Sequence, residues 1–576
     1  MSKQTGRPAA ARRWLLGAGL LLVVAAALVA LCAVPIRARM RSWTGEEDLR
    51  QQVKGSLALA YLTLTHPAPR TSPYAPLQHA GLSPYGVNTF LEQEAEPEKV
   101  ERTLAFIAEA GFHWVRQEFP WEDIEISAKG DFWDHKWDQD AWAKYDRIVE
   151  AADRHGLEII ARLDNPPAWS RAVGNAPGWE KGPPDDYADY GDFVYTLVSR
   201  YRGRLRYYQI WNEPNIFPEW GDQAVDAAAY TELLRIAYLR AKEADPDCVI
   251  VAAGLAQTIE QGPRNLSDLT YLEGMYAAGA GAYFDVMGAQ TYGLWTGPQD
   301  QRLGARRTNF SRVQLLREAM VRHGDAHKPI WATEVGWNAA PTDLAEFPYG
   351  RVTEQRQAEY TVAAYRRAQA EWPWLGVMNY WFFRRPSDAE REQAWYYFRM
   401  LEPDFTPLPV YGAMASLARG APTLSLGYHQ EDHWALDYAG PWEHREDSAA
   451  VLGGYALGSQ GATVVFDYWG SDLAVVLRDA AEASRLTATI DGRAAPLRPA
   501  PRGLPVDATA VGVGERLPYG RHTAVLTATG GEVGLDAIIA WRRPFPWIAW
   551  LGGGLAVLLL AAGALGFRAR GARHHG

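Results

Sequence analysis

Short runs of β-branched and aromatic residues alternate with helical patterns through the middle of the chain, from about residue 84 to residue 419. Strand and helix patterns that alternate in this way predict right-handed βαβ units and a parallel sheet. The expected strands are residues 85–90, 112–117, 158–163, 207–211, 248–253, 284–290, 330–333 and 376–381. Eight such units indicate a (β/α)₈ TIM barrel with enlarged loops.

Helical patterns fill the intervals between these strands, with the clearest ones at residues 98–110, 185–201, 227–244 and 353–371. The alternative architecture is an open doubly wound sheet. That fold usually carries a glycine-rich phosphate loop after a strand, but neither GxGxxG nor a P-loop follows any of the expected strands. The sequence therefore favours the barrel, and functional residues are expected at the carboxyl-terminal ends of its strands.

Two of the expected strands end on a carboxylate. Glu213 follows the fourth strand in the segment Ile210-Trp-Asn-Glu-Pro-Asn215, and Glu334 ends the seventh in Ile330-Trp-Ala-Thr-Glu-Val-Gly-Trp337. A charged group at the end of a buried strand costs several kcal/mol unless it is paired or used. One interpretation is that both are capping or salt-bridged structural acids. The other is glycoside hydrolysis, in which one acid protonates the leaving oxygen and the other attacks the sugar.

Further motifs occur along the chain around the two glutamates. They are Val115-Arg116 with Phe119-Pro-Trp121, Pro167-Ala-Trp169, Asp285-Val-Met-Gly288 with Tyr292, and Trp381 on the eighth strand. Together with Asn212-Glu213-Pro and Glu334, this set resembles clan A of the glycoside hydrolases over roughly residues 81–419. Within the clan the chain is most similar to family 39 and to related family 5 enzymes. The resemblance implies a retaining glycosidase on a (β/α)₈ barrel.

The resemblance also implies roles for five residues. Glu213 would be the acid/base and Glu334 the nucleophile. Asn212 would hydrogen-bond the sugar 2-hydroxyl, a contact that strengthens in the transition state. Arg116 and Tyr292 would keep Glu334 ionised, because a nearby cation and a donated hydrogen bond both favour the charged form.

Aromatic residues near the expected strand ends are candidates for substrate contact. The resemblance implies that Trp381 is the floor of the subsite for the reacting sugar. Trp121, Trp169, Trp295 and Trp337 follow strands two, three, six and seven, where they are either stacking platforms or anchors of the loop core. Trp169 and Trp337 are the stronger platform candidates, because they follow the strand ends closely.

One position departs from the family pattern. Many clan members have His two residues before the strand-six Tyr, whereas this chain has Gln290. Glutamine can donate a hydrogen bond but cannot carry charge. We therefore expect a differently tuned polar network beside the nucleophile, with activity retained.

Uncharged stretches occur near both ends of the chain, at residues 14–34 and 545–567. Each is long enough to span a bilayer as a helix. A cleaved signal peptide is the alternative for the first, but its apolar run is long for a signal and Leu31 does not fit a lipoprotein pattern before Cys32. Basic residues lie in both tails, residues 1–13 and 568–576. The positive-inside rule therefore predicts cytoplasmic tails and an extracytoplasmic region between the two spans at the plasma membrane.

The segment before the second span changes character. Residues 35–80 are expected to be a linker, and residues 421–541 show more glycine and period-two alternation, as at 462–466, 473–477 and 523–527. This pattern is typical of an antiparallel β-sandwich. Its turns resemble those of the galactose-binding-like jelly rolls found beside carbohydrate enzymes. Two roles stay open for this domain, a structural spacer and a sugar-binding module.

Composition excludes several function classes. A net charge of −10 argues against nucleic acid as a partner. The 13 His are scattered without an HExxH motif or a Cys/His cluster, so neither a metal nor another cofactor is expected. Of the two cysteines, Cys32 lies in an apolar stretch and Cys248 in an expected buried strand, so no disulfide is expected.

The sequence thus predicts a membrane-anchored retaining glycoside hydrolase whose two glutamates act on a surface or secreted polysaccharide or oligosaccharide. Its partners would be that substrate and the lipid bilayer, through two transmembrane helices. One alternative is a catalytically silent polysaccharide-binding or assembly subunit on the same fold. The other is a transglycosylase, which would share the covalent intermediate.

Overall fold

The computed structural model describes residues 36–499 and 509–543. Eight parallel strands form one sheet in the order β7-β6-β5-β2-β1-β10-β9-β8. Parallel bridges from Val251 to Val286 and from Leu255 to Ala289 join the two outer strands, so the sheet curls into an almost closed barrel. The strands are β1 (Tyr85–Thr89), β2 (Trp114–Glu118), β5 (Glu158–Leu163), β6 (Tyr207–Ile210), β7 (Val249–Ala252), β8 (Met287–Gln290), β9 (Ile330–Val335) and β10 (Leu375–Tyr380).

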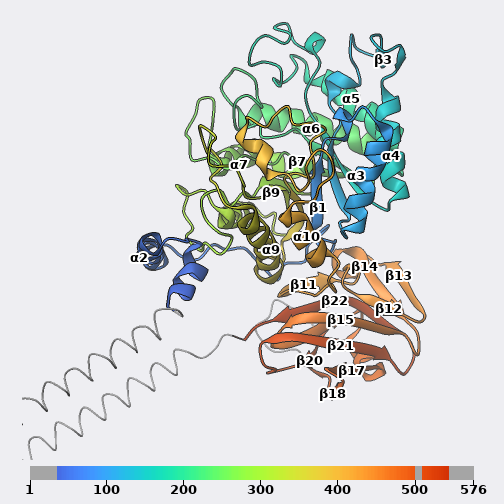
Figure 1. The fold of residues 1–576 in the computed structure, drawn as a ribbon. Helices are drawn as coiled ribbons and strands as arrows, with labels where there is room; N and C mark the ends of the chain where they lie inside the picture. The colour runs from blue at the N-terminus through green and yellow to red at the C-terminus, as the bar shows by residue number, and fades with distance from the viewer. Residues whose placement is uncertain (1–35, 500–508, 544–576) are drawn as a thin grey trace, which may run out of the picture.

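A helix follows every strand of the barrel, as the alternating pattern predicts (Figure 1). Helix α6 shows why the segment folds locally. The side chain of Asp226 caps it by accepting hydrogen bonds from the backbone N–H groups of Ala228 and Ala229, and its apolar face, which includes Leu233 and Leu234, is buried. The helices are α3 (Pro97–Glu109), α4 (Trp142–Arg154), α5 (Tyr187–Tyr201), α6 (Ala227–Ala244), α7 (Asp268–Ala277), α8 (Val313–Arg322), α9 (Glu354–Glu371) and α10 (Pro409–Ala418).

The interior of the barrel changes from apolar to polar along the strands. One cluster of buried side chains includes Trp114, Ile160, Tyr207, Trp331 and Val377. The residues two positions further along the same strands are Arg116, Arg162, Gln209, Thr333 and Asn379, all of them buried. Because alternate residues of a strand face the same side, the same face that packs the lower barrel becomes polar toward its carboxyl-terminal end.

A second, strand-rich unit follows the barrel. Its two antiparallel sheets share one core, to which Val464 and Phe466 contribute from one sheet and Val475 and Ile538 from the other, so the unit is a β-sandwich as predicted. One sheet contains β12 (Asp437–Ala439), β15 (Thr463–Gly470), β17 (Leu486–Ile490), β18 (Arg493–Ala495) and β21 (Gly520–Ala528). The other contains β11 (Gly427–Gln430), β13 (Trp442–Glu446), β14 (Gly454–Gly458), β16 (Asp472–Leu477), β19 (Arg498–Pro499), β20 (Ala510–Gly514) and β22 (Val533–Trp541).

The sandwich lies against the amino-terminal end of the barrel strands (Figure 1). Trp434 donates a backbone hydrogen bond of 2.8 Å to the carbonyl of Gly81. Its ring lies 6.1 Å from that of Tyr85 and 6.2 Å from that of His113, two residues at the starts of β1 and β2. The sandwich is therefore at the opposite end of the barrel from the strand ends that carry the two glutamates.

The region before the barrel contains a helix. Residues 35–80, expected as a linker, include α2 (Leu49–Thr65), which Asp48 caps. The two expected transmembrane segments, 14–34 and 545–567, lie outside the described residues. Within the described ranges, no helix combines the length and the apolar character that crossing a bilayer requires.

Candidate active site

Glu213 and Glu334 both lie at the carboxyl-terminal end of the barrel. Glu334 is the fifth residue of β9, and Glu213 comes three residues after β6 ends. The backbone turns sharply there, with φ of 71° at Trp211 and 42° at Glu213. Left-handed backbone at residues other than glycine persists only where its surroundings hold it. Here the N–H of Glu213 donates a hydrogen bond of 3.1 Å to the carbonyl of Gly254.

Glu334 has one donor for each carboxylate oxygen. Arg116 Nη1 lies 3.0 Å from Oε1, and the hydroxyl of Tyr292 donates to Oε2 at 2.5 Å. Both contacts stabilise the anionic form of the carboxylate. The sequence thus selected three residues, Arg116, Tyr292 and Glu334, that the fold brings into direct contact.

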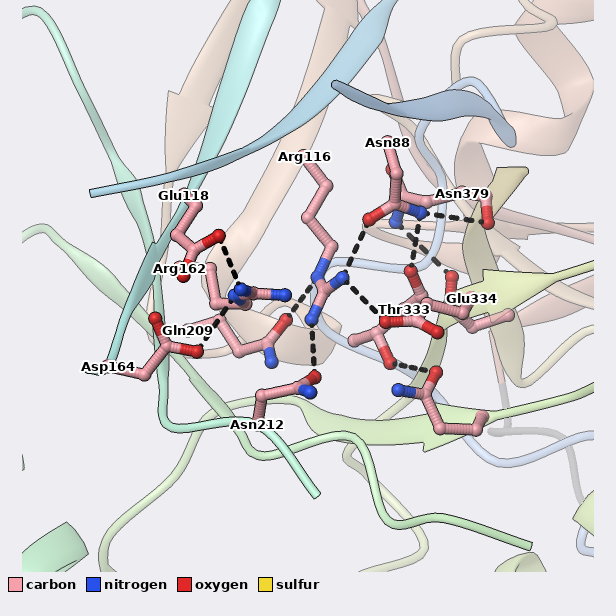
Figure 2. A network of polar contacts seen from close by, with 12 residues as sticks. Asn88, Arg116, Glu118, Arg162, Asp164, Gln209, Asn212, Thr333, Glu334 and Asn379 are labelled. Carbon is pink, nitrogen blue, oxygen red and sulfur yellow. Dashed lines mark hydrogen bonds and ion pairs between the residues drawn. The ribbon is translucent and has the colours of Figure 1, made fainter. Parts of the chain in front are cut away.

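Arg116 is buried at the centre of a polar network (Figure 2). Its Nε donates to Gln209 Oε1 at 2.7 Å, and Nη1 also donates to Asn88 Oδ1 at 2.6 Å. Nη2 donates to Asn212 Oδ1 at 2.9 Å. Four partners, from β1, β6, the turn after β6 and β9, therefore fix the plane of the guanidinium group and, through it, the positions of Asn212 and Glu334.

Glu213 has the opposite electrostatic setting. Burial raises the pKa of its carboxyl well above the usual range, and the negative charges of Glu334 and Glu219 raise it further. Lys181 and Arg116 oppose this shift but do not cancel it. Glu213 is thereby favoured in its protonated form, in which it can donate a proton.

Aromatic side chains accompany the two carboxylates. Tyr292, Tyr349 and Trp381 are partly buried around a cluster that includes Phe90, whose ring meets that of Trp381 edge-on at 5.5 Å. Burial raises the pKa of Tyr349, and the charges of Glu213 and Glu334 raise it further. Tyr349 was not among the predicted site residues. It comes from the long loop after β9, where no strand or helix pattern gives its position.

The loop tryptophans divide into two groups. Trp337 is wholly buried, its indole N–H donates to the carbonyl of Thr296 at 2.8 Å, and its ring packs on Phe310 and Tyr360. The prediction that Trp337 contacts substrate is therefore wrong, because loop and helix side chains cover the ring completely. Trp121 is likewise an anchor of the loop core, with no exposed surface.

Trp169 and Trp295 are more accessible. Trp169 is partly buried, meets Trp121 edge-on at 5.5 Å, and donates its indole N–H to the carbonyl of Glu125 at 2.8 Å. Trp295 is 61% exposed. Both keep ring surface that a sugar could reach.

Gln290 ends β8, lies beside Glu334 in the register of β8 and β9, and is buried. Its Oε1 accepts a hydrogen bond of 3.0 Å from the hydroxyl of Thr333, the residue before Glu334. This neighbourhood is tight, because a Cβ on Gly254 would lie 2.1 Å from the Thr333 hydroxyl oxygen. Gln290 therefore supports the strand that carries Glu334 through Thr333.

A second charged network extends the site toward β2 and β5. Arg162 pairs with Glu118 at 2.6 Å and with Asp164 at 2.9 Å, as Figure 2 shows. Glu92 lies beside it with a pKa raised to about 7, chiefly by burial and then by the charge of Glu118. Sequence reasoning missed these residues, together with Asn88 and Gln209. A usable signal existed for Arg162 and Gln209, each of which interrupts apolar residues of its strand, whereas Glu92 and Asp164 lie outside the strands.

A further ion pair lies beside Asn212. Lys181 contacts Glu219 Oε1 at 2.6 Å, and Asn212 Nδ2 donates to Glu219 Oε2 at 3.5 Å. This pair brings the charge of Glu219 close to Glu213. In the part of the chain that the structure describes, no group of three or more His, Cys, Asp or Glu side chains could hold a metal ion.

Comparisons with known proteins gave matches among solved structures only. No protein-family model and no curated protein matches the sequence. A family 39 glycoside hydrolase from the gut symbiont Bacteroides cellulosilyticus WH2 is 17% identical, with 79% of this chain and 83% of that one covered and a TM-score of 0.43. A GH39 enzyme from Xanthomonas axonopodis pv. citri is 15% identical, with 81% and 99% covered and a TM-score of 0.42.

The exo-β-1,4-mannosidase Op5Man5 from Opitutaceae bacterium strain TAV5 is 16% identical, with 61% of each chain covered and a TM-score of 0.42. At identities this low, the chemistry of the present site has to be judged from its own side chains.

Proposed function

We propose that this protein is a retaining glycoside hydrolase in which Glu213 is the acid/base and Glu334 the nucleophile. The observation that carries the proposal is the opposite setting of the two carboxylates at one end of one barrel. Arg116 and Tyr292 stabilise the anion of Glu334, whereas burial and neighbouring negative charge raise the pKa of Glu213. Two carboxyl groups whose environments favour different protonation states suit an acid and a nucleophile.

The proposed reaction has two displacements. In the first, a Glu334 oxygen attacks the anomeric carbon while Glu213 gives its proton to the leaving glycosidic oxygen, which departs as an alcohol. In the second, Glu213 takes a proton from water, and that water attacks the anomeric carbon and releases Glu334. Asn212, held by Arg116, would bind the 2-hydroxyl of the reacting sugar, and Trp381 would lie under its ring.

Two other functions use the same fold. A catalytically silent polysaccharide-binding subunit would need neither an ionised nor a protonated glutamate, and the buried Arg116–Glu334 pair would then be a costly feature without a use. A transglycosylase would form the same glycosyl-enzyme and differ only in the acceptor. A hydrolase and a transglycosylase differ in whether water or another sugar attacks the glycosyl-enzyme intermediate.

The proposed location is the outer side of the plasma membrane, with an anchor at each end of the chain. The uncharged stretches 14–34 and 545–567 and their basic flanks support this placement. An enzyme tethered there meets polymers made or displayed at its own membrane, so a surface or secreted polysaccharide is the proposed substrate. The sandwich contacts the barrel at the end remote from Glu213, which favours the spacer role.

The decisive experiment is covalent trapping. The full chain in detergent is treated with a panel of 2-deoxy-2-fluoro glycosides that carry a good leaving group, and the labelled peptide is identified by mass spectrometry. A glycosyl ester on Glu334 is expected, with loss of turnover on the matching aryl glycoside. If no sugar in the panel labels the protein and no glycoside is turned over, the binding-subunit alternative gains support.

A further inference from the structure

Helix α2 presents a largely apolar face to solvent, with two basic residues, Arg50 and Lys54, in the first half of that face. Five large apolar side chains at helical spacing are between 46% and 86% exposed, namely Leu49, Val53, Leu57, Tyr61 and Leu64. Residues spaced by three or four positions share one face of a helix. Single exposed apolar side chains are common on protein surfaces, but a contiguous apolar face on one helix marks an interaction site.

The helix is attached to the rest of the molecule by its first half. Only Gln52 and Gly55 of α2 are buried. The second half stands off from the barrel, since Leu59 and Leu62 on its inner side line a cavity of about 850 Å³ that α7 and α8 border. Figure 1 shows α2 at the side of the barrel, away from the sandwich. From Gly55 to Thr65 the helix carries no charged residue.

Charged residues surround the start of the helix. The three acidic residues before α2 are engaged within the protein. Glu46 pairs with Arg302 at 2.7 Å, Glu47 accepts from the Tyr360 hydroxyl at 2.6 Å, and Asp48 caps the helix.

Arg41 of the same region pairs with Glu47 at 2.8 Å, whereas four other basic residues are exposed. Arg37, Arg39, Arg50 and Lys54 are exposed, and the guanidinium of Arg39 lies 5.5 Å from the ring centre of Trp43. Although the whole chain carries a net charge of −10, this surface is basic and apolar with an amphipathic tryptophan. That combination complements an anionic lipid surface.

We propose that α2 is an interfacial helix that lies in the surface of an anionic membrane, with Leu49, Val53, Leu57, Tyr61 and Leu64 inserted at the boundary of headgroups and acyl chains. The position of α2 in the chain supports this occupant, because the helix begins 15 residues after the proposed anchor 14–34 ends. The inference rests on the proposed membrane location and is independent of the glycosidase chemistry. Such a helix would hold the barrel close to the bilayer at a fixed orientation.

The test uses site-directed nitroxide labels on the full chain reconstituted into phosphatidylglycerol and phosphatidylethanolamine vesicles. Labels are placed at Leu57→Cys and Leu64→Cys, with Gln51→Cys as the matched control, an exposed polar position of α2 outside the face that carries Leu57 and Leu64. Cys32→Ser removes one native thiol, and Cys248 is buried with its pKa raised to about 12, so it does not compete for label. Collision with oxygen, which enters lipid, is compared with collision with a water-soluble nickel complex.

We expect the oxygen-to-nickel collision ratio at Leu57 and Leu64 to exceed that at Gln51 severalfold. Equal, water-like ratios at all three sites in a chain that floats with vesicles would overturn the interfacial helix alone. A chain that does not float would overturn the anchors and this inference together. Spin–spin broadening at Leu57 and Leu64 without a high oxygen ratio would identify a second copy as the occupant and also overturn it. Turnover on an aryl glycoside is measured separately and tests the proposed glycosidase activity, which does not depend on any of these outcomes.

Discussion

Arg116 and Glu334 form an ion pair, 3.0 Å between Nη1 and Oε1, in which the side chains are only 1% and 6% exposed. Removing two charges from water costs several kcal/mol for each ion, and their attraction repays this only with good geometry and further hydrogen bonds. Arg116 has those bonds, to Asn88, Gln209 and Asn212. The pair therefore fixes the Glu334 carboxylate in one place.

Arg116→Met should destabilise the barrel by about 3–5 kcal/mol, because it leaves the Glu334 carboxylate buried without its cation. Adding Glu334→Gln to this variant should recover part of the loss, since the uncompensated charge is then gone. The measurement is urea unfolding followed by tryptophan fluorescence. Arg322→Met, which removes an exposed pair with Glu273, is the control and should change stability by less than about 1 kcal/mol. An equal effect of both substitutions would contradict the role assigned to the buried pair.

The positions of the strands and of the main site residues could be predicted because their signals are local. Each barrel strand is a short apolar run between helical patterns, and the expected helix 227–244 has the same ends as α6. Glu213 and Glu334 were found because each charged residue ends such a run. Once the barrel was assumed, its geometry predicted that these ends meet.

Contacts that depend on side chains from distant strands were missed. Asn88 and Gln209 hold Arg116, but neither residue predicts its partner, because Arg116 lies at least 28 residues away in the sequence. The prediction for Trp337 was wrong for a related reason. Its closeness to the end of β9 was correct, yet only the packing of Phe310 and Tyr360 decides whether the ring faces substrate or core.

Glu213→Gln should make the free energy of unfolding less sensitive to rising pH. In the wild type the folded-state pKa of Glu213 is raised, so the unfolded chain loses this proton first as the pH rises above the model-peptide value for Glu. Stability from this group is thus fully present at low pH and falls as pH rises to the folded-state pKa. The slope is at most about 1.4 kcal/mol per pH unit. Urea unfolding of both proteins from pH 4 to 8 measures the difference in their free energies of unfolding. This difference should grow with pH in favour of Glu213→Gln. A constant difference would show that the folded-state pKa of the carboxyl is not raised.

Trp337 and Trp381 should respond differently to truncation. Trp337→Ala removes a fully buried ring and should cost about 3–5 kcal/mol of stability. Trp381→Ala should weaken binding of the sugar and raise KM while stability falls less, since Trp381 is only partly buried. Thermal unfolding and steady-state kinetics on an aryl glycoside separate the two effects. A rise in KM for Trp337→Ala at a temperature where it is fully folded would restore Trp337 as a substrate contact.

Reporter fusions test the proposed topology. Alkaline phosphatase fused after residue 541 should be active, because it would lie outside the cytoplasm, and the same reporter after residue 576 should be silent. A cytoplasmic reporter at each position provides the reciprocal control. Activity of that cytoplasmic reporter after residue 541, with an inactive phosphatase there, would place the barrel inside the cell.

The two carboxylates should fail in different ways when they are removed. In Glu213→Ala, substrates with good leaving groups need no proton, so the glycosyl-enzyme should still form while its breakdown slows. This variant should show a burst of leaving group, and azide should rescue it by attacking the intermediate without base assistance. Glu334→Ala should lose several orders of magnitude of activity on every substrate, because no covalent intermediate can form.

The stereochemistry of the products decides whether this division is correct. Two inversions at the anomeric carbon give net retention, so proton NMR of the first product released by the wild type should show the configuration of the substrate. The azide adduct from Glu213→Ala should have the same configuration, since azide replaces water in the second step. An inverted product would mean that Glu334 activates water directly. In that case Arg116 and Tyr292 would be orienting a general base instead of a nucleophile.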